Sequence, residues 1–237
     1  MIGTLINIVA VLSGGLLGIV LGSRLSEKIK STITNGMGLF TLVVGIKMAL
    51  ETNNALYTLG GLLIGSLLGE WGKIEDGLDV VGKYLEAKFN KSDAGSRNFV
   101  AGFVTASLLF CVGPMTILGA FQDGILGNYE LLAIKSVLDG FAALALASSL
   151  GPGVLFSVII ILIYQGGLTL LASRINIYLT NPMVIEMTAV GGVILMGISI
   201  SSLLEIKKIR IGNFLPALIV SPLLAWLVEW IKTISGR

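Results

Sequence analysis

Long, uninterrupted apolar runs dominate the chain, and short polar stretches separate them. A helix needs about 20 mainly apolar residues to cross a bilayer. Backbone in lipid must satisfy its own hydrogen bonds, and a β-barrel would show short alternating segments instead of continuous runs. The pattern therefore predicts an all-α polytopic membrane helix bundle of about eight spans, forming a single transmembrane domain over residues 1–237. The predicted spans cover residues 2–22, 35–50, 55–70, 99–120, 131–149, 153–172, 183–204 and 212–232.

The stretch 73–91 lies outside these spans and has an amphipathic pattern. Ile74, Leu78, Val81 and Leu85 recur on one helical face, and charged residues fill the other. This pattern predicts a cytoplasmic helix that lies along the membrane surface. A helix that docks a partner protein is the alternative.

The two ends of the chain resemble each other. Repeat 1, about 2–71, has its counterpart in repeat 2, about 153–232, and the central spans at about 99–149 lie between them. Five spans separate equivalent spans, so the two copies would cross the membrane in opposite directions. Inverted repeats around a central site are the construction of many secondary transporters. Chance matching of glycine-rich apolar segments is the alternative. The strongest matches join Gly38 to Gly192, Glu51 to Glu205, Trp71 to Trp226, and Gly14-Gly15 to Gly166-Gly167.

Composition narrows the function classes. With 54% hydrophobic and 13% charged residues, the chain has too little polar surface for a soluble globule, which carries about 25% charge. A soluble enzyme and a nucleic-acid-binding domain are thereby excluded. The chain has no histidine and one cysteine, which excludes His/Cys zinc sites, histidine acid–base chemistry and an intrachain disulfide. We expect no enzyme activity and no cofactor.

The distribution of basic residues predicts the orientation. Lysines and arginines concentrate in the stretches 24–30, 73–97 and 207–210, and few occur in the loops on the other side. Basic loops stay in the cytoplasm. Both termini are therefore predicted to be extracytoplasmic, in a bacterial plasma (inner) membrane. The run 2–22 is longer than a signal-peptide core and follows no basic residue, so we expect it to be retained as a span.

A proline interrupts the fourth predicted span. Gly113-Pro114 lies within an apolar run, and proline removes a backbone donor and clashes with the preceding turn. The groups freed by such a break must line a cavity or meet protein. Transporters bind ions and substrates at discontinuous helices. Gly113 and Pro114 are therefore predicted substrate contacts, and a simple packing kink is the alternative.

Two charged residues lie within the fifth predicted span. Lys135 and Asp139 are four residues apart and so share one helical face. A charge at the bilayer centre costs about 2.5–3.5 kcal/mol, which pairing would reduce. Asp139 and Asp123 are predicted to bind the coupling ion, and Lys135 to attract an anionic group of the substrate. A purely structural pair, and an Asp123 that lies in an outer loop, are the alternatives.

Two glutamines complete the predicted site. Gln122 precedes Asp123, and Gln165 lies in the sixth span beside two glycines that leave room around its amide. Both are predicted to contact substrate, although Gln165 could instead tie helices together. No metal site is predicted.

Glycines also recur at helical spacing, in two stripes that let helices approach closely. These contacts form either within one chain or in a homo-oligomer. The stripes are Gly14, Gly18 and Gly22, and Gly61, Gly65 and Gly69.

Four segments carry a family resemblance that covers nearly the whole chain. They are Gly3 to Leu25, FCVGPMTILGAFQDG at 110–124, KSVLDG at 135–140 and YQGG at 164–167. These segments resemble the bacterial YdfK/YqgA-type integral membrane proteins. The resemblance implies a multi-pass protein of the bacterial plasma membrane, and it supplies neither a substrate nor site residues.

The leading hypothesis is therefore an ion-coupled secondary transporter of a small polar or anionic solute. Its partners would be the lipid bilayer and that solute or ion, with no nucleic acid. A channel or facilitator would use the same polar residues along a continuous path. A membrane protein that does not transport and instead binds a partner is the third hypothesis.

Overall fold

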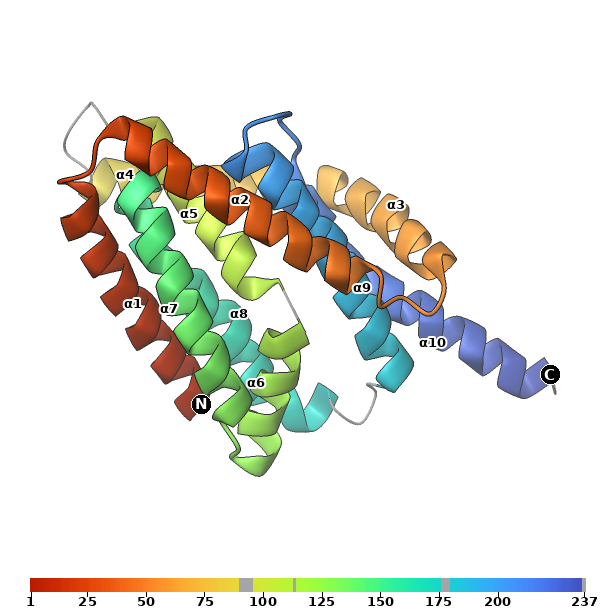
Figure 1. Cartoon of the computed structure of the whole chain (residues 1–237). Helices are drawn as coiled ribbons and strands as arrows, with labels where there is room; N and C mark the ends of the chain where they lie inside the picture. The colour runs from red at the N-terminus through yellow and green to blue at the C-terminus, as the bar shows by residue number, and fades with distance from the viewer. Residues whose placement is uncertain (90–95, 113, 176–179, 236–237) are drawn as a thin grey trace.

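The computed structural model describes residues 1–89, 96–112, 114–175 and 180–235. Every regular element in these ranges is helical, which confirms the all-α prediction (Figure 1). The elements are α1 Ile2–Gly22, α2 Glu27–Ala49, α3 Ala55–Trp71, α4 Ile74–Phe89, α5 Ser96–Cys111, α6 Pro114–Leu126, α7 Glu130–Leu150, α8 Gly153–Ile175, α9 Asn181–Ile198, the π-helical turn η2 Ser199–Leu203, the short 3₁₀ helix η3 Ile211–Phe214 and α10 Ala217–Ser235.

Six helical segments of the described chain are long and apolar enough to span a membrane. They are α1, α2, α7, α8, α9 continued by η2, and α10 with η3. Helices α5 and α6 together make a seventh candidate, bent by 61°. The predicted break is thus confirmed, since α5 ends at Cys111 and α6 begins at Pro114; Gly113 itself lies outside the described residues. The remaining predicted span, 55–70, is α3, whose 17 residues rise about 26 Å, slightly less than the roughly 30 Å of hydrocarbon.

Local signals explain several helix ends. The Ser26 side chain accepts a hydrogen bond from the amide of Ile29, and the Asn54 side chain accepts one from the amide of Leu56, so each caps the helix that follows. Gly151, at φ 81°, ends α7 in a conformation that favours glycine. The following Pro152 cannot continue the helix, and the chain turns directly into α8.

The glycine stripes are packed within the chain. A Cβ atom on Gly14 would lie 2.0 Å from the carbonyl oxygen of Gly140, so α1 and α7 touch backbone to backbone. In the same way, a Cβ on Gly65 would lie 2.5 Å from the backbone of Ala217, where α3 meets α10. These faces are therefore occupied inside one molecule. A homo-oligomer stays a prediction, and it would have to use other surfaces.

Helix α5 lies at the centre of the molecule and packs against α4, α7, α8 and α9. Its side chains Phe99, Phe103 and Phe110 are fully buried in the hydrophobic core. The outer helices instead expose large apolar side chains, among them Leu67 and Trp71 of α3. Such exposure is unfavourable in water and is expected where lipid surrounds a helix bundle.

One end of the molecule, which we call the basic end, holds the described residues of the three basic stretches, namely 24–30, 73–89, 96–97 and 207–210 (Figure 1). There the Arg210 guanidinium pairs with the carboxylates of Glu70 (2.7 Å) and Asp76 (2.5 Å), joining the stretch after η2 to α3 and α4. The Ser149 hydroxyl donates to the carbonyl of Lys30 at 3.0 Å, joining α7 to the start of α2. Met1 and the last turns of α10 both lie away from this end (Figure 1).

The helix expected within 73–91 is α4, at the basic end. Its apolar face is turned towards α5, with Leu85 buried and Leu78 packed against the core. Val81 on the same face is 42% exposed, and the side chain of Phe89 lies outside the described residues. The helix therefore covers the bundle as well as presenting an outer surface.

Candidate functional site

A cluster of buried polar side chains lies where α1, α7 and α8 meet. It contains both charged residues predicted in the fifth span and the glutamine predicted in the sixth. We call it the buried polar cluster. Its members are Thr4, Asn7, Lys135, Asp139, Gln165 and Thr169, all of them buried.

Asp139 is the centre of the cluster. Its Oδ2 atom accepts hydrogen bonds from the Lys135 ammonium and from Asn7 Nδ2, the latter at 3.0 Å. The same Asn7 amide group donates to Gln165 Oε1, also at 3.0 Å. One asparagine on α1 therefore connects the ion pair of α7 to α8.

The cluster continues towards the start of α1. Gln165 Nε2 lies 3.4 Å from the Thr4 hydroxyl, which in turn lies 3.4 Å from the Thr169 hydroxyl. Thr169 donates to the backbone carbonyl of Gln165 at 2.9 Å. Both Asp139 and Gln165 thus have partners on α1.

Helix geometry explains why these residues meet. Lys135 and Asp139 are four residues apart, as are Gln165 and Thr169, so each pair shares one helical face. The glycine contacts hold α1 against α7 and bring Asn7 within reach of Asp139. At 1.5 Å per residue, Asp139 lies about 14 Å from the start of α7, roughly halfway along a spanning helix. A carboxylate at that depth needs the donors that surround it.

Asn7 carries an acceptor with no partner. The residue is fully buried, and its Oδ1 atom receives no hydrogen bond. Buried polar atoms are nearly always satisfied, so an orphaned one requires an explanation. Here it lies on the residue that bridges Asp139 and Gln165, so the cluster keeps one acceptor that could receive a further hydrogen bond.

Asp123 lies at the beginning of α1. Its Oδ2 atom accepts a hydrogen bond from the amide of Gly3 at 3.0 Å and lies 2.9 Å from the amino group of Met1. Gly3 is adjacent to Thr4, so Asp123 borders the buried polar cluster, but within the described part of the chain it forms no hydrogen bond to the side chains of that cluster. Its partners serve to anchor α1 against α6.

The remaining predicted residues are placed differently. Gln122 is exposed and is not brought to the cluster; its backbone carbonyl accepts from the amide of Asn128 at 3.2 Å. Pro114 begins α6, its side chain lies outside the described part of the chain, and Gly113 lies outside it altogether. The sequence identified Lys135, Asp139 and Gln165, which the structure brings together.

The sequence did not identify Asn7, the residue that joins them. Its only signal is a carboxamide within an otherwise apolar run. A second unpredicted feature is Glu186, a fully buried carboxylate near the start of α9. It accepts hydrogen bonds from the hydroxyls of Thr52 and Thr58 and from the amide of Asn53, at 2.8–3.1 Å, and so anchors the turn between α2 and α3.

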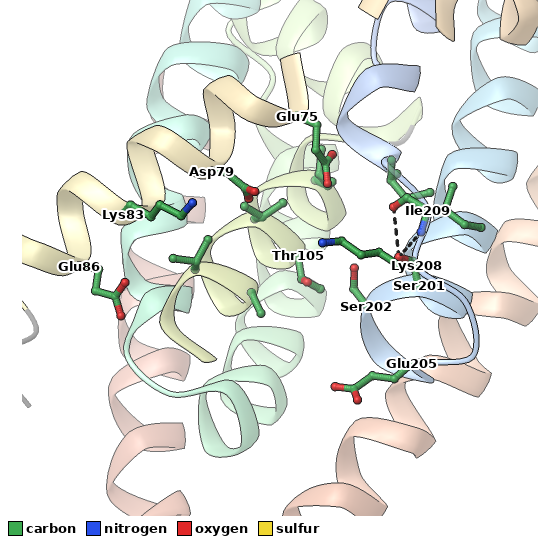
Figure 2. Close-up of a pocket in the computed structure, with 15 residues that line it drawn as sticks. Glu75, Asp79, Lys83, Glu86, Thr105, Ser201, Ser202, Glu205, Lys208 and Ile209 are labelled. Atoms are coloured by element: carbon green, nitrogen blue, oxygen red, sulfur yellow. Dashed lines mark hydrogen bonds between the residues drawn. The ribbon is translucent and has the colours of Figure 1, made fainter. Parts of the chain in front are cut away.

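A polar cavity of about 490 Å³ opens at the basic end (Figure 2). It lies between α4, α5 and the stretch from η2 to η3. The Lys83 and Lys208 side chains extend into it from opposite walls, and Glu205 reaches in from a third direction (Figure 2). Its other polar lining residues are Glu75, Asp79, Glu86, Thr105, Ser201 and Ser202.

Burial affects one carboxyl group of this cavity. Glu75 Oε2 accepts a 2.6 Å hydrogen bond from the amide of Gly212. Desolvation raises the pKa of Glu75 above its ordinary value of 4.5, although the Gly212 hydrogen bond opposes this shift. On the outer side of α4, the hydrogen bond with Asp76 raises the pKa of Arg210 and keeps its guanidinium charged.

A second cavity of about 310 Å³ lies deeper and has a mostly apolar lining. Leu108 lines both cavities and separates them. Cys111 and Tyr164 line the inner one, together with Ser107, whose buried hydroxyl has no hydrogen-bond partner. Cys111 lies within electrostatic range of Lys135 and Asp139, so the apolar cavity is near the buried polar cluster.

The described ranges contain no group of three or more Asp, Glu, Cys or His side chains that could hold a metal ion.

Comparison with known proteins agrees with the membrane architecture. The chain is 27% identical to the "Uncharacterized membrane protein YdfK" of Bacillus subtilis, over 97% of both chains. It is 34% identical to the "Uncharacterized protein YqgA" of Escherichia coli, over 97% of this chain and 98% of that protein. No solved structure matches it significantly. A family model described as "Protein of unknown function (DUF554)" matches residues 2–226, and the chain therefore belongs to this family of YdfK/YqgA-like proteins.

Proposed function

We propose that this protein is an ion-coupled secondary transporter of a small polar or anionic solute across the bacterial plasma membrane. One observation carries the proposal: a buried Lys135–Asp139 ion pair lies about halfway along a spanning helix and is held by side chains of two other helices. Intramembrane charges are costly and mark ion or substrate pathways.

The pair provides a simple means of coupling. When Asp139 binds a proton or a sodium ion, its attraction for Lys135 weakens and the ammonium becomes free to attract an anionic group of the solute. Asn7 and Gln165 position the carboxylate and transmit its change of charge to α1 and α8. A ligand shifts a conformational equilibrium only by its differential affinity for the two states, and an altered ion pair supplies such a difference.

The packing of α2 against α9 supports an inverted repeat. In the sequence match, Gly38 is equivalent to Gly192, and Gly45 is equivalent to Ser199. The Ser199 hydroxyl donates to the carbonyl of Gly38 at 2.6 Å, and Gly45 packs against the carbonyl of Gly192. A pseudo-two-fold axis between the helices would exchange these two contacts, as the proposed inverted repeat requires. Inverted repeats related in this way commonly enclose a transporter's substrate site.

Helix α5 supports a route to the pair. Thr105 and Leu108 line the polar cavity, and Leu108 and Cys111 line the apolar one. These residues follow one side of α5 up to the bend that precedes α6. A solute entering at the basic end would meet Leu108 before it reached the ion pair. This apolar interruption of a polar route favours alternating access over a continuously open channel.

Reconstitution tests the proposal. Liposomes containing the protein are given a proton gradient with an internal pH indicator, or a sodium gradient with an internal sodium indicator, and are then exposed to amino acids, dicarboxylates or polyamines. We expect one solute class to collapse the gradient with wild-type protein but not with Asp139→Asn. Glu130→Gln, an exposed substitution in the first turn of the same helix, is the matched control and should transport normally.

Full flux through Asp139→Asn would refute the assigned role. Solute flux without dependence on either gradient would favour a facilitator. A protein that moves none of these solutes would favour the partner-binding hypothesis.

We further propose that the basic end faces the cytoplasm and that both termini are extracytoplasmic. The clustering of all three basic stretches at one end supports this orientation (Figure 1). Epitope tags at either terminus should be labelled from outside intact spheroplasts. A tag that becomes accessible only after permeabilisation would overturn the topology.

A further inference from the structure

The polar cavity at the basic end carries an inference beyond the buried pair. We propose that it binds a small solute bearing both ammonium and carboxylate groups, with Lys83 and Lys208 holding the carboxylate and Asp79 and Glu205 holding the ammonium. The role of this cavity in transport rests on the proposed function, whereas the binding of the solute to the cavity does not depend on that function.

The charged side chains of the cavity form no ion pairs with one another, although Lys208 and Asp79 both act electrostatically on Glu75. Among the described residues, the ion pairs at this end join Arg210 to Glu70 and Asp76 and Lys30 to Glu27. The charged residues that line the cavity form no ion pair among the described residues. These are Glu75, Asp79, Lys83, Glu86, Glu205 and Lys208.

Unpaired charges of both signs around one cavity are complementary to a ligand that carries both signs. Exposed opposite charges would otherwise pair with each other at little cost. Lys83 and Lys208 extend into the cavity from opposite walls, and each can offer its ammonium group to a carboxylate there (Figure 2). Glu86 adds a second indication, since its Oε1 atom is shielded from solvent yet receives no hydrogen bond.

Size and lining are consistent with a small organic solute. The volume of about 490 Å³ is within the roughly 300–1,000 Å³ of small-molecule sites. Val100, Val104, Leu108 and Ile209 form an apolar part of the wall that suits methylene groups. Thr105 and Ser202 add hydroxyls that can donate or accept.

The balance of charge narrows the ligand class. Four carboxylates and two ammonium groups line the cavity, so a simple dianion would be repelled. A simple diamine would leave the two lysines without a partner. A diamino monocarboxylic acid, with two ammonium groups and one carboxylate, offers partners to both signs of charge in the lining and keeps the net positive charge that the excess of carboxylates favours. L-lysine is therefore the probe, and cadaverine, which is L-lysine without its carboxylate, is the matched comparator.

Calorimetric titration of the purified protein in detergent tests the assignment. We expect L-lysine to bind at least about tenfold more tightly than cadaverine, and glutarate to bind more weakly than either. Lys208→Met should remove the advantage of L-lysine while leaving cadaverine binding unchanged or stronger. Glu205→Gln should weaken both. Lys28→Met, an exposed substitution at the same end that does not line the cavity, should change nothing.

Several outcomes overturn the assignment. They are equal affinities for L-lysine and cadaverine, no heat with millimolar L-lysine, or an unchanged L-lysine affinity in Lys208→Met. If Lys208→Met fails to fold, as judged by its unfolding temperature, Lys83→Met provides the same test from the opposite wall. L-lysine binding without flux would refute the transporter and keep the site. Flux of another solute without L-lysine binding would refute the site and keep the transporter.

Discussion

The Lys135–Asp139 pair allows a test that separates a structural lock from a functional switch. Replacing Lys135 alone by alanine leaves the Asp139 carboxylate buried, with the Asn7 amide as its remaining donor. Breaking a buried pair by removing one partner costs about 3–5 kcal/mol. The insertion cost of an uncompensated aspartate, about 2.5–3.5 kcal/mol, agrees with that magnitude. We therefore expect Lys135→Ala to lower the free energy of unfolding by about 3 kcal/mol.

Removing both charges should have a much smaller effect on stability. The double variant Lys135→Met, Asp139→Leu conserves volume roughly and leaves no buried charge, and such replacements are often neutral or stabilising. It loses the hydrogen bond from Asn7, which is worth about 1 kcal/mol or less in a membrane protein. Asn7 keeps its hydrogen bond to Gln165. We expect the double variant to unfold within about 1–2 kcal/mol of the wild type and to be inactive in transport.

The assay combines detergent-induced unfolding, followed by helical circular dichroism, with flux in liposomes. If the ion pair acts as a functional switch, the double variant should be stable but inactive in transport. A stable double variant that retains flux would show that the pair only joins helices. A double variant as unstable as Lys135→Ala would refute the electrostatic reasoning, because the cost would then lie in packing.

Three further predictions concern packing, buried hydrogen bonds and pH. Gly65→Ala should destabilise the protein by about 1–3 kcal/mol because its Cβ would lie 2.5 Å from the backbone of α10. Gly36→Ala is the control: no atom lies within 4 Å of its Cβ, so this variant should be neutral or stabilising by up to about 1 kcal/mol. Equal unfolding free energies of the two variants would contradict both expectations. Glu186→Ala should lower the free energy of unfolding by about 1–3 kcal/mol because it leaves buried donors unsatisfied. Glu186→Gln should lower it less, because an acceptor oxygen remains. An unchanged unfolding temperature in both variants would exclude the anchoring role of Glu186. Burial raises the pKa of Glu75 above 4.5, so its contribution to stability is fully present below about pH 4.5 and is lost as pH rises through the raised pKa. Glu75→Gln should flatten this part of the stability–pH profile, and a profile identical to that of the wild type would contradict the prediction.

The spanning helices could be predicted because each is a long apolar run, a property that is local in sequence. The i, i+4 pair of Lys135 and Asp139 was predictable for the same reason, since one helix presents both residues. Asn7 was not, because a single carboxamide in an apolar helix gives no indication of what it faces. Its role follows from the approach of α1 to α7, which the glycines permit but do not identify.

The polar cavity illustrates a second limit. The charged face of α4 was predictable as polar, and exposure to water is the ordinary expectation for such a face. Only the fold places Lys83 opposite Lys208, some 125 residues later in the chain. Glu205 reaches the cavity from a backbone at φ 50°, a conformation that non-glycine residues rarely adopt and that no sequence pattern indicates. Long-range convergence of this kind is decided by tertiary packing.

The glycine contacts also restrict which parts of the molecule can rearrange. Where Gly14 meets Gly140 and Gly65 meets Ala217, two backbones touch without intervening side chains that could adjust. Helices α1 and α7 would therefore travel together as one rigid pair, and α3 and α10 as another. Gln165 of α8 is joined to the first pair by hydrogen bonds, which can break and reform within a single cycle. Any opening and closing of the protein is thus expected at the seam between α8 and the α1–α7 pair, where the hydrogen bonds of Gln165 with Asn7 and Thr4 would have to break.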